Sequence, residues 1–136
     1  FKYLIKLTDK YGLGKRVIMP GYRSDLKEIF SAMDIFIYPS LEKDTSPLAL
    51  LSAISAGLPA IVSNIRSLEE VVELCSAVDM FDLTNRDELL LLIAKYEDEY
   101  IRIKNGKKNR EEGKMYFDIA THSDKMMKIF NLNLSG

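Results

Sequence analysis

The chain has 136 residues, of which 47% are hydrophobic and 29% are charged, as in an ordinary globular protein of one domain. Nineteen basic side chains against twenty acidic ones leave a formal net charge of −1. This balance gives no reason to propose nucleic acid as a partner, because such binding needs a basic face. The single Cys75 excludes an internal disulfide and a multi-cysteine metal site. No apolar run approaches the roughly 20 residues that cross a bilayer.

The first residues, Phe1-Lys2-Tyr3-Leu4, have a helical pattern and begin without Met or a signal peptide. We therefore expect the chain to be a fragment of a longer protein. Gly12-Leu13-Gly14 follows this helical segment and precedes a predicted strand. Its position predicts a helix-ending turn rather than the Gly-x-Gly-x-x-Gly turn of a dinucleotide-binding fold.

Continuous apolar runs predict buried strands of a parallel sheet, because such strands are covered on both faces. They are residues 16–19, 35–38 and 60–62, with 78–81 as a weaker fourth. Segments of helical periodicity lie between them, such as the one that places Leu26, Ile29 and Phe30 on one face. This alternation predicts an α/β fold with a Rossmann-like parallel sheet of at least four strands, flanked by helices.

Polar residues predict where the helices begin and end. Ser24-Asp25 and Asn85 each precede a helical pattern, and Ser67-Leu68-Glu69-Glu70 fits a capping box. Cys75 ends an apolar helical stretch, where a small buried residue is the expected role. The last 40 residues predict a helical tail, with breaks near Asn105-Gly106 and Gly113.

A basic cluster lies in the helical tail and is interrupted by two glutamates, which favours a solvated helix face over a binding surface. The cluster consists of Lys104, Lys107, Lys108, Arg110 and Lys114. His122, the only histidine, also lies in this tail. We interpret it as a surface residue of a helix rather than as a catalytic group.

Ligands of an open parallel sheet bind beyond the carboxyl ends of its strands. The loops that follow the predicted strands are residues 20–23, 39–47 and 63–67. The middle loop enters a helix, with Ser46 as the expected cap and Pro47 at the first helical position. The N–H groups of Leu48 and Ala49 would then face outward at the positive end of the helix dipole, which suits a phosphate.

Four segments occur in a specific order along the chain. They are Arg-Val-Ile-Met-Pro-Gly at 16–21, Ala-Met-Asp-Ile-Phe-Ile-Tyr-Pro-Ser at 32–40, Ala-Ile-Ser-Ala-Gly-Leu-Pro-Ala-Ile-Val-Ser at 53–63 and Glu-Val-Val at 70–72. Over about residues 8–98 this order resembles the group 1 (retaining, GT-B fold) glycosyltransferases. The resemblance implies that residues 1–136 form a single domain, one half of a GT-B architecture. That half is the truncated C-terminal domain, which binds the donor and works with a missing N-terminal acceptor domain of the same protein.

The resemblance also implies roles for two positions that carry paired acidic residues in the family. The first falls on Asp44, which would be the catalytic residue near the donor sugar and phosphates, with Glu42 as a nearby rival. The second falls on Ser52, where the family has a carboxylate that accepts hydrogen bonds from the ribose. A charge-assisted hydrogen bond contributes about 1.5–3 kcal/mol, so we expect its loss to weaken donor binding about tenfold or more.

Further donor contacts are implied by the two loops that flank the site. The resemblance places the base against Gly21, Tyr22 and Arg23. It places the phosphates against Thr45, Ser46, Leu48 and Ala49. Arg66 and Ser67 stand where relatives often have glycines, and we expect Arg66 to be exposed. The cationic pair that holds the diphosphate in the family matches no position of this chain.

The resemblance implies an enzyme that transfers a sugar from a nucleoside-diphosphate sugar to an acceptor, with retention, as in polysaccharide biosynthesis. The isolated fragment is expected to be inactive. No cofactor and no metal are expected, because GT-B enzymes hold the diphosphate with cations and helix dipoles. The expected location is cytoplasmic, and a peripheral position of the parent at the inner face of a membrane stays open. The alternative is a degenerate, non-catalytic domain for packing or partner binding, suggested by Ser52, Arg66 and Ser67.

Overall fold

The computed structural model describes residues 1–41 and 47–118. In chain order its elements are α1 (Lys2–Lys10), α2 (Leu26–Ser31), β1 (Phe36–Tyr38), α3 (Leu48–Ala56), β2 (Ala60–Ser63), the 3-10 helix η1 (Arg66–Leu68), α4 (Glu69–Leu74), β3 (Val78–Phe81), α5 (Arg86–Lys95) and α6 (Glu99–Phe117). None of the helices in these ranges is long and apolar enough to cross a membrane.

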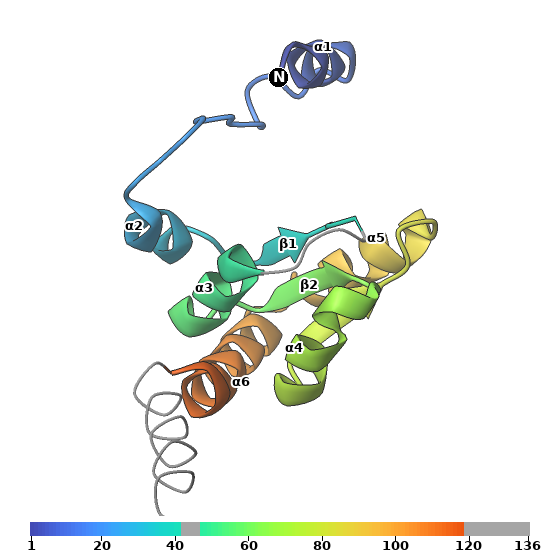
Figure 1. The fold of residues 1–136 in the computed structure, drawn as a ribbon. Helices are drawn as coiled ribbons and strands as arrows, with labels where there is room; N and C mark the ends of the chain where they lie inside the picture. The colour runs from blue at the N-terminus through green and yellow to red at the C-terminus, as the bar shows by residue number, and fades with distance from the viewer. Residues whose placement is uncertain (42–46, 119–136) are drawn as a thin grey trace, which may run out of the picture.

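The three strands form a parallel sheet in the order β1-β2-β3 (Figure 1). Phe36 pairs with Ala60, and Ala60 pairs with Val78, so β2 is the central strand. All four residues of β2 are buried, as expected for a strand covered on both faces. The strands predicted at 35–38, 60–62 and 78–81 are confirmed, with shifts of at most one residue.

Successive residues of β2 pack into two different cores. Ala60 and Val62 lie in one cluster with Ile54 of α3 and with residues of α4. Ile61 lies in another with Tyr96 and with residues of α5. Because side chains alternate along a strand, α3 and α4 cover one face of the sheet and α5 covers the other. This is the predicted α/β organisation.

The long helix α6 packs closely along α3, and two glycines allow the contact. A Cβ on Gly106 would overlap the backbone of Gly57, and a Cβ on Gly113 would lie 2.6 Å from a methyl carbon of Ile54. Between them Asn109 is fully buried, and its side-chain amide donates to the carbonyl oxygen of Leu58 at 2.9 Å. The breaks predicted at both glycines are wrong, because α6 runs without interruption from Glu99 to Phe117.

The N-terminal part stands apart from the sheet (Figure 1). None of the side chains of α1 is buried in the described chain. Helix α1 ends at Lys10, and Gly12 (φ 65°) follows in a turn. The N–H of Gly12 donates to the carbonyl oxygen of Asp9 and that of Leu13 to the carbonyl oxygen of Thr8, so the predicted helix-ending turn is confirmed. The strand predicted at residues 16–19 is wrong: these residues pair with no strand among those described, and Ile18 is 84% exposed.

Helix starts agree only partly with the sequence. Asn85 caps α5 as predicted, since its side chain accepts a hydrogen bond from the N–H of Glu88 at 3.2 Å. The capping box at residues 67–70 does not form, because a 3-10 turn includes Ser67 and makes Leu68 the cap of α4. Pro47 is the cap residue of α3 rather than its first helical residue.

Candidate functional site

The loops beyond the carboxyl ends of the strands are joined to one another. The hydroxyl of Ser63, at the end of β2, donates to the carbonyl oxygen of Ser40 after β1 at 2.6 Å. The N–H of Asn64 donates to the carbonyl oxygen of Phe81 at the end of β3, at 2.8 Å. Ser63 is fully buried. At the edge of the sheet where ligands of such folds bind, the segments that follow the three strands are therefore linked by hydrogen bonds.

The loop predicted to contact a base lies open to solvent. Gly21 has a φ of 72°, and Tyr22 is 95% exposed. Arg23 forms an ion pair with Asp25, with its Nε donating to a carboxylate oxygen at 2.7 Å. The Arg23 guanidinium holds the pKa of the Asp25 carboxyl below its ordinary value. The guanidinium is thus engaged within its own loop.

The middle loop leads into α3, whose first turn carries two of the predicted residues. The side chain of Leu48 is 67% exposed, and its carbonyl oxygen accepts a hydrogen bond from the Ser52 hydroxyl at 2.8 Å. The Ser52 hydroxyl donates its only proton to the helix backbone. Its oxygen can therefore form a further hydrogen bond only as an acceptor. Ala49 is exposed beside Leu48. Asp44, Thr45 and Ser46 lie outside the described residues, as does Glu42.

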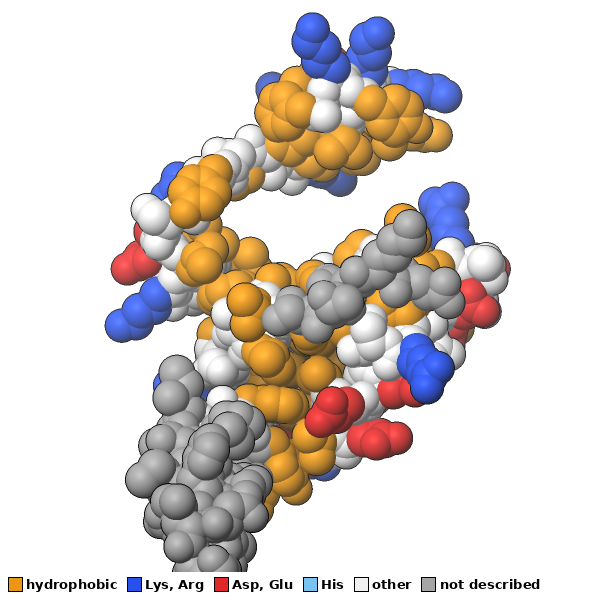
Figure 2. All heavy atoms as spheres, viewed as in Figure 1, with side chains coloured by type: hydrophobic (Ala, Val, Ile, Leu, Met, Phe, Trp, Pro, Cys, Tyr) orange, Lys and Arg blue, Asp and Glu red, His pale blue; other side chains and the backbone are white. Residues whose placement is uncertain are grey.

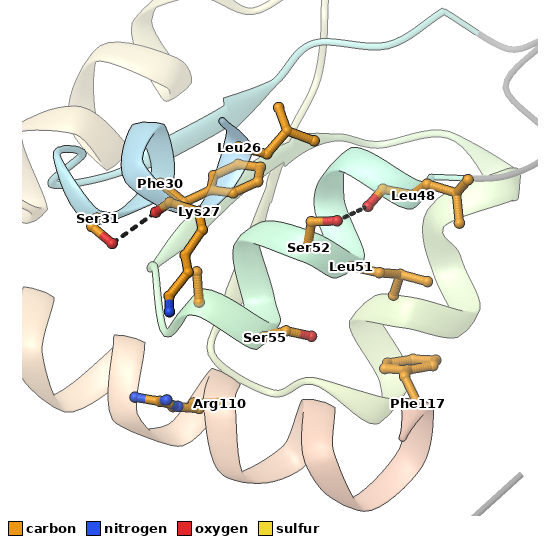
Figure 3. A pocket seen from close by; sticks show the side chains of 11 residues that line it. Leu26, Lys27, Phe30, Ser31, Leu48, Leu51, Ser52, Ser55, Arg110 and Phe117 are labelled. Carbon is orange, nitrogen blue, oxygen red and sulfur yellow. Dashed lines mark hydrogen bonds between the residues drawn. The ribbon is translucent and has the colours of Figure 1, made fainter. Parts of the chain in front are cut away.

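A cavity of about 660 Å³ lies between α2, α3 and α6 (Figure 3). Leu48 and Ser52 line it, whereas Ala49 and residues 21–23 do not. Its apolar wall comes from all three helices. The apolar lining residues are Leu26, Phe30, Leu48, Leu51, Ala56 and Phe117.

The charged residues that line this cavity, among those described, are both basic. Lys27 extends from α2 and Arg110 from α6 toward the end of α3 that carries Ser55 (Figure 3). Ser31, Ser52 and Ser55 add hydroxyl groups to the wall. An apolar cavity with hydroxyls and two cations suits a ligand with an apolar or aromatic body and a negative charge.

Sequence reasoning did not identify Lys27, Ser55 or Arg110 as candidates. Ser55 follows Ser52 by three residues on one helix, so helical spacing could have found it. Arg110 belongs to the basic cluster interpreted as a solvated face; all five residues of the cluster are exposed, but Arg110 also lines the cavity. Its contact with the cavity depends on the packing of α6 against α3, for which the sequence carries no local signal.

A second polar cluster joins β3 to the helices on the other face of the sheet. The hydroxyl of Tyr96 donates to Asp79 at 2.6 Å, and Lys95 contacts the same carboxylate at 2.7 Å. Asn105 donates to the Tyr96 oxygen at 3.0 Å. Burial, followed by the hydrogen bond to Asp79, raises the pKa of Tyr96 above its ordinary value. The phenol therefore stays neutral, as befits a structural network.

No group of three or more His, Cys, Asp or Glu residues in the described ranges is arranged to hold a metal ion.

Comparison with known proteins identifies the family. The family model described as "Glycosyl transferases group 1" matches residues 1–113. A curated protein of Escherichia coli, "UDP-Gal:alpha-D-GlcNAc-diphosphoundecaprenol alpha-1,3-galactosyltransferase", is 31% identical over 118 residues. That match covers 87% of this chain and 30% of the relative.

Solved structures of GT-B glycosyltransferases share the fold. Sucrose-phosphate synthase from Thermosynechococcus elongatus matches 98% of this chain and 34% of its own, with a TM-score of 0.82 and 20% identity. WaaG, a glycosyltransferase involved in lipopolysaccharide biosynthesis, matches 94% of this chain and 35% of its own, with a TM-score of 0.75 and 20% identity. The chain thus spans about a third of the length of these proteins, and it belongs to the group 1 glycosyltransferases.

Proposed function

We propose that this chain binds the nucleoside-diphosphate sugar donor of a glycosyltransferase that transfers a sugar with retention of configuration. The observation that carries the proposal is the cavity between α2, α3 and α6, which includes Leu48 in the first turn of α3. It combines an apolar wall, hydroxyl groups and the cations Lys27 and Arg110. This chemistry complements a ligand that joins a flat base and a ribose to a diphosphate.

The roles of single residues in the proposal follow from their positions. The start of α3 presents the N–H groups of Leu48 and Ala49 and the positive end of a helix dipole to a phosphate. Ser52, one turn further on, accepts a hydrogen bond from a ribose hydroxyl. We assign the catalytic role to Asp44 and further phosphate contacts to Thr45 and Ser46.

The base is assigned to the loop before α2. Gly21, Tyr22 and Arg23 lie just ahead of Leu26, which lines the cavity. The ring of Tyr22 is 95% exposed and is thus available for stacking on a base. Binding of the donor would bring this loop toward the start of α3.

The name of the curated relative suggests which classes of donor and acceptor this protein would use. Its name specifies UDP-galactose as donor and a diphosphoundecaprenol-linked sugar as acceptor. We propose a uridine-diphosphate hexose as donor for this protein and a lipid-linked saccharide as acceptor. The acceptor would be held by the remaining domain of a longer parent, at the cytoplasmic surface of a membrane. Charge on the diphosphate is balanced by cations and the dipole of α3, without a metal or another cofactor.

A second candidate function is a non-catalytic domain that retains the fold for packing or partner binding. The Ser52 hydroxyl favours it, because this side chain already bonds to the helix backbone and carries no charge for a ribose. Arg66 and Ser67, both exposed, stand where the resemblance to the family implies glycines. The two functions differ in one measurable property, which is nucleotide binding.

The test is a titration of the chain with UDP, GDP and ADP, followed by amide resonances in NMR spectra. Donor binding predicts shifts at residues 21–23 and 48–52 that are largest for UDP, with the exposed residues of α5 as an internal reference. If no nucleotide shifts these amides at millimolar concentration, the titration is repeated with a longer form of the protein. Silence in that form too would contradict donor binding and favour the non-catalytic function.

A further inference from the structure

A cavity of about 360 Å³ lies at the amino end of β3, between the end of α5 and one side of α6. Its volume is within the range of pockets that hold small molecules. The cavity shares no lining residue with the one between α2, α3 and α6. It also lies at the opposite end of the strand from the edge where ligands of such sheets usually bind. The proposed donor site therefore gives this cavity no role.

The charge on the cavity wall is mainly positive. Among the described residues its charged lining consists of one carboxylate, that of Asp79, and three lysines, Lys95, Lys104 and Lys108. Lys104 and Lys108 lie one turn apart on α6, and like charges at this spacing destabilise a helix slightly. Neither of the two forms an ion pair within the described part of the chain. Two positive charges on this wall thus have no acidic partner.

The acid at the right spacing to neutralise Lys108 is engaged elsewhere. Glu112 follows Lys108 by four residues, which is the spacing of a helical ion pair. Its two carboxylate oxygens instead accept hydrogen bonds from Ser76, from the backbone N–H at 2.9 Å and from the hydroxyl at 2.7 Å. Lys107, by contrast, pairs with Glu111 at 3.9 Å and does not line the cavity. The packing of α6 against the start of β3 therefore leaves Lys108 available to a ligand.

Two further donors are held in place by the polar network around Tyr96. The Nζ of Lys95 donates to both carboxylate oxygens of Asp79, at 2.9 and 2.7 Å, and keeps a third proton. The side-chain amide of Asn105 donates one proton to the Tyr96 oxygen at 3.0 Å and keeps the other. The charge of Asp79 is offset by Lys95 and by the Tyr96 hydroxyl. Positioned donors and unpaired ammonium groups together suit a compact anion.

The lysines of this cavity differ in their surroundings from those of α1. Lys2, Lys6 and Lys10 are exposed, and Figure 2 shows most basic side chains of α1 projecting outward from the helix. Ammonium groups in such positions keep their water, because no wall displaces it. Lys104 and Lys108 instead border a concave surface, where donors from other segments can bind the same anion. A solvated helix face alone does not account for this arrangement.

We propose that this cavity binds the phosphate group of a soluble phosphate monoester. The ammonium groups of Lys104 and Lys108 bind the phosphate oxygens, and Lys95 and Asn105 donate further hydrogen bonds to them. A phosphate monoester carries about 1.5 to 2 negative charges at pH 7, which matches the two lysines that lack an acidic partner.

The same phosphate chemistry occurs on lipid headgroups, and the shape of the cavity favours the soluble source. Its walls come from the start of β3, from α5 and from α6, so a phosphate is contacted from several sides. Tyr100 and Ile101 line the cavity about one turn before Lys104. The ring of Tyr100 is 72% exposed and offers an apolar contact to the organic part of a small ester.

Titrations with inorganic phosphate and with phenyl phosphate, followed by amide resonances at constant ionic strength, test the site. We expect saturable shifts at residues 76–77 and 104–108, and none with sodium chloride. Lys104→Gln and Lys108→Gln should each weaken binding of both phosphates about tenfold, because each removes a charge-assisted hydrogen bond. Lys107→Gln is the matched control on the same helix and should leave both affinities unchanged. Equal losses in all three variants, or shifts that never saturate, would overturn the proposal.

Two further measurements test the ester and the source of the phosphate. Tyr100→Ala should weaken binding of phenyl phosphate several-fold and leave that of inorganic phosphate unchanged; equal effects on the two would contradict the apolar contact. Sedimentation with phosphatidic acid vesicles, compared with phosphatidylcholine vesicles, tests the lipid source. If the chain binds the acidic vesicles through Lys104 and Lys108 while neither soluble phosphate shifts the amides, the soluble ester is rejected in favour of a lipid headgroup.

Discussion

Gly106 of α6 lies directly on the backbone of Gly57 at the end of α3, so closely that a Cβ at position 106 would overlap the Gly57 carbonyl oxygen. Helix propensity alone predicts that Gly106→Ala stabilises the protein by about 1 kcal/mol. The steric conflict is with backbone and cannot be relieved by a rotamer change. We therefore expect Gly106→Ala to lower the free energy of unfolding by about 2 kcal/mol or more, measured by urea denaturation.

The same substitution at Gly113 and at Gly14 should have smaller effects on stability, because the added Cβ meets less steric conflict there. Gly113→Ala should also destabilise the protein but cost less, because its new methyl group would lie 2.6 Å from Cγ2 of the buried Ile54, a smaller overlap and one with a side chain rather than with backbone. Gly14→Ala should cost nothing measurable, because its Cβ would have only an ordinary contact of 3.6 Å with Asp9. If all three variants were equally stable, the close packing of α6 on α3 would be wrong.

The buried amide of Asn109 provides a pH-dependent test. Its Oδ1 has no hydrogen-bond partner among the described residues, while its Nδ2 donates to Leu58. Asn109→Asp places a carboxylate against that carbonyl, and we expect a loss of about 3 kcal/mol in stability at pH 7. Burial raises the pKa of the new carboxyl in the folded state, so the loss applies above the unfolded pKa of about 4 and fades below it.

Chemical denaturation at pH 7 and at pH 4 measures that difference. Asn64→Asp is the control, because Asn64 is exposed and its replacement should cost little at either pH. A penalty for Asn109→Asp that does not shrink on acidification would show that the new carboxyl is not buried.

Cys75 should be almost unreactive in the folded protein. It is fully buried, and burial, followed by the charge of Glu112, raises the pKa of its thiol to about 11. A thiol pKa about two units above the ordinary value reduces the thiolate fraction at pH 8 about 100-fold, and steric shielding slows the reaction further. We expect alkylation by iodoacetamide to be slower than that of a Ser67→Cys thiol by at least this factor. Since the unfolded thiol ionises first, stability should also fall as the pH rises from 9 toward 11.

Ser52→Glu should improve nucleotide binding if the proposed ribose contact is right. A carboxylate at this position can accept charge-assisted hydrogen bonds, which would tighten UDP binding about tenfold. Ser55→Glu is the control, because Ser55 lines the same cavity one turn further from the start of α3, near Lys27 and Arg110. It should not improve binding. Isothermal titration with UDP measures both, and equal affinities for the two variants would remove Ser52 from the site.

The catalytic assignment is tested by sugar transfer in a longer form of the protein. We expect Asp44→Ala to reduce kcat about 100-fold, as for loss of a group that acts in the transition state. Ser52→Ala should reduce transfer far less, because the hydroxyl contributes a single neutral hydrogen bond. The same measurement on Glu42→Ala tests whether Glu42, rather than Asp44, is the catalytic carboxylate. Full activity of Asp44→Ala together with an inactive Glu42→Ala would move the role to Glu42.

The sequence predicted those strands whose burial shows directly in their composition. Residues 35–38, 60–62 and 78–81 are continuous apolar runs, and each became a strand between two layers of helices. Residues 16–19 have the same composition and did not, because a strand also needs a neighbour, and the described chain offers these residues none. Gly106 and Gly113 were wrongly predicted to interrupt a helix, because glycine is conformationally free. In the structure both lie inside α6, where their small size allows close packing on α3.

The lining of the candidate cavity could be predicted where it depends on position along one helix and not where it depends on contacts between distant segments. Leu48 and Ser52, placed by the start of α3, line the cavity. Lys27 and Arg110, which supply its charge, come from helices on either side, and only the tertiary packing brings them together. Tyr22 and Arg23 are close to α2 in sequence, yet they lie outside the cavity wall.

The hydrogen bond between the hydroxyl of Ser63 and the carbonyl of Ser40 has a mechanical consequence. It links the loop that leads to α3 with the loop that leads to η1, and a fully buried side chain makes the link. A displacement of Ser40 is therefore transmitted to the end of β2, because the hydrogen bond holds the two residues together. Ser63→Ala would remove this link between the ends of β1 and β2.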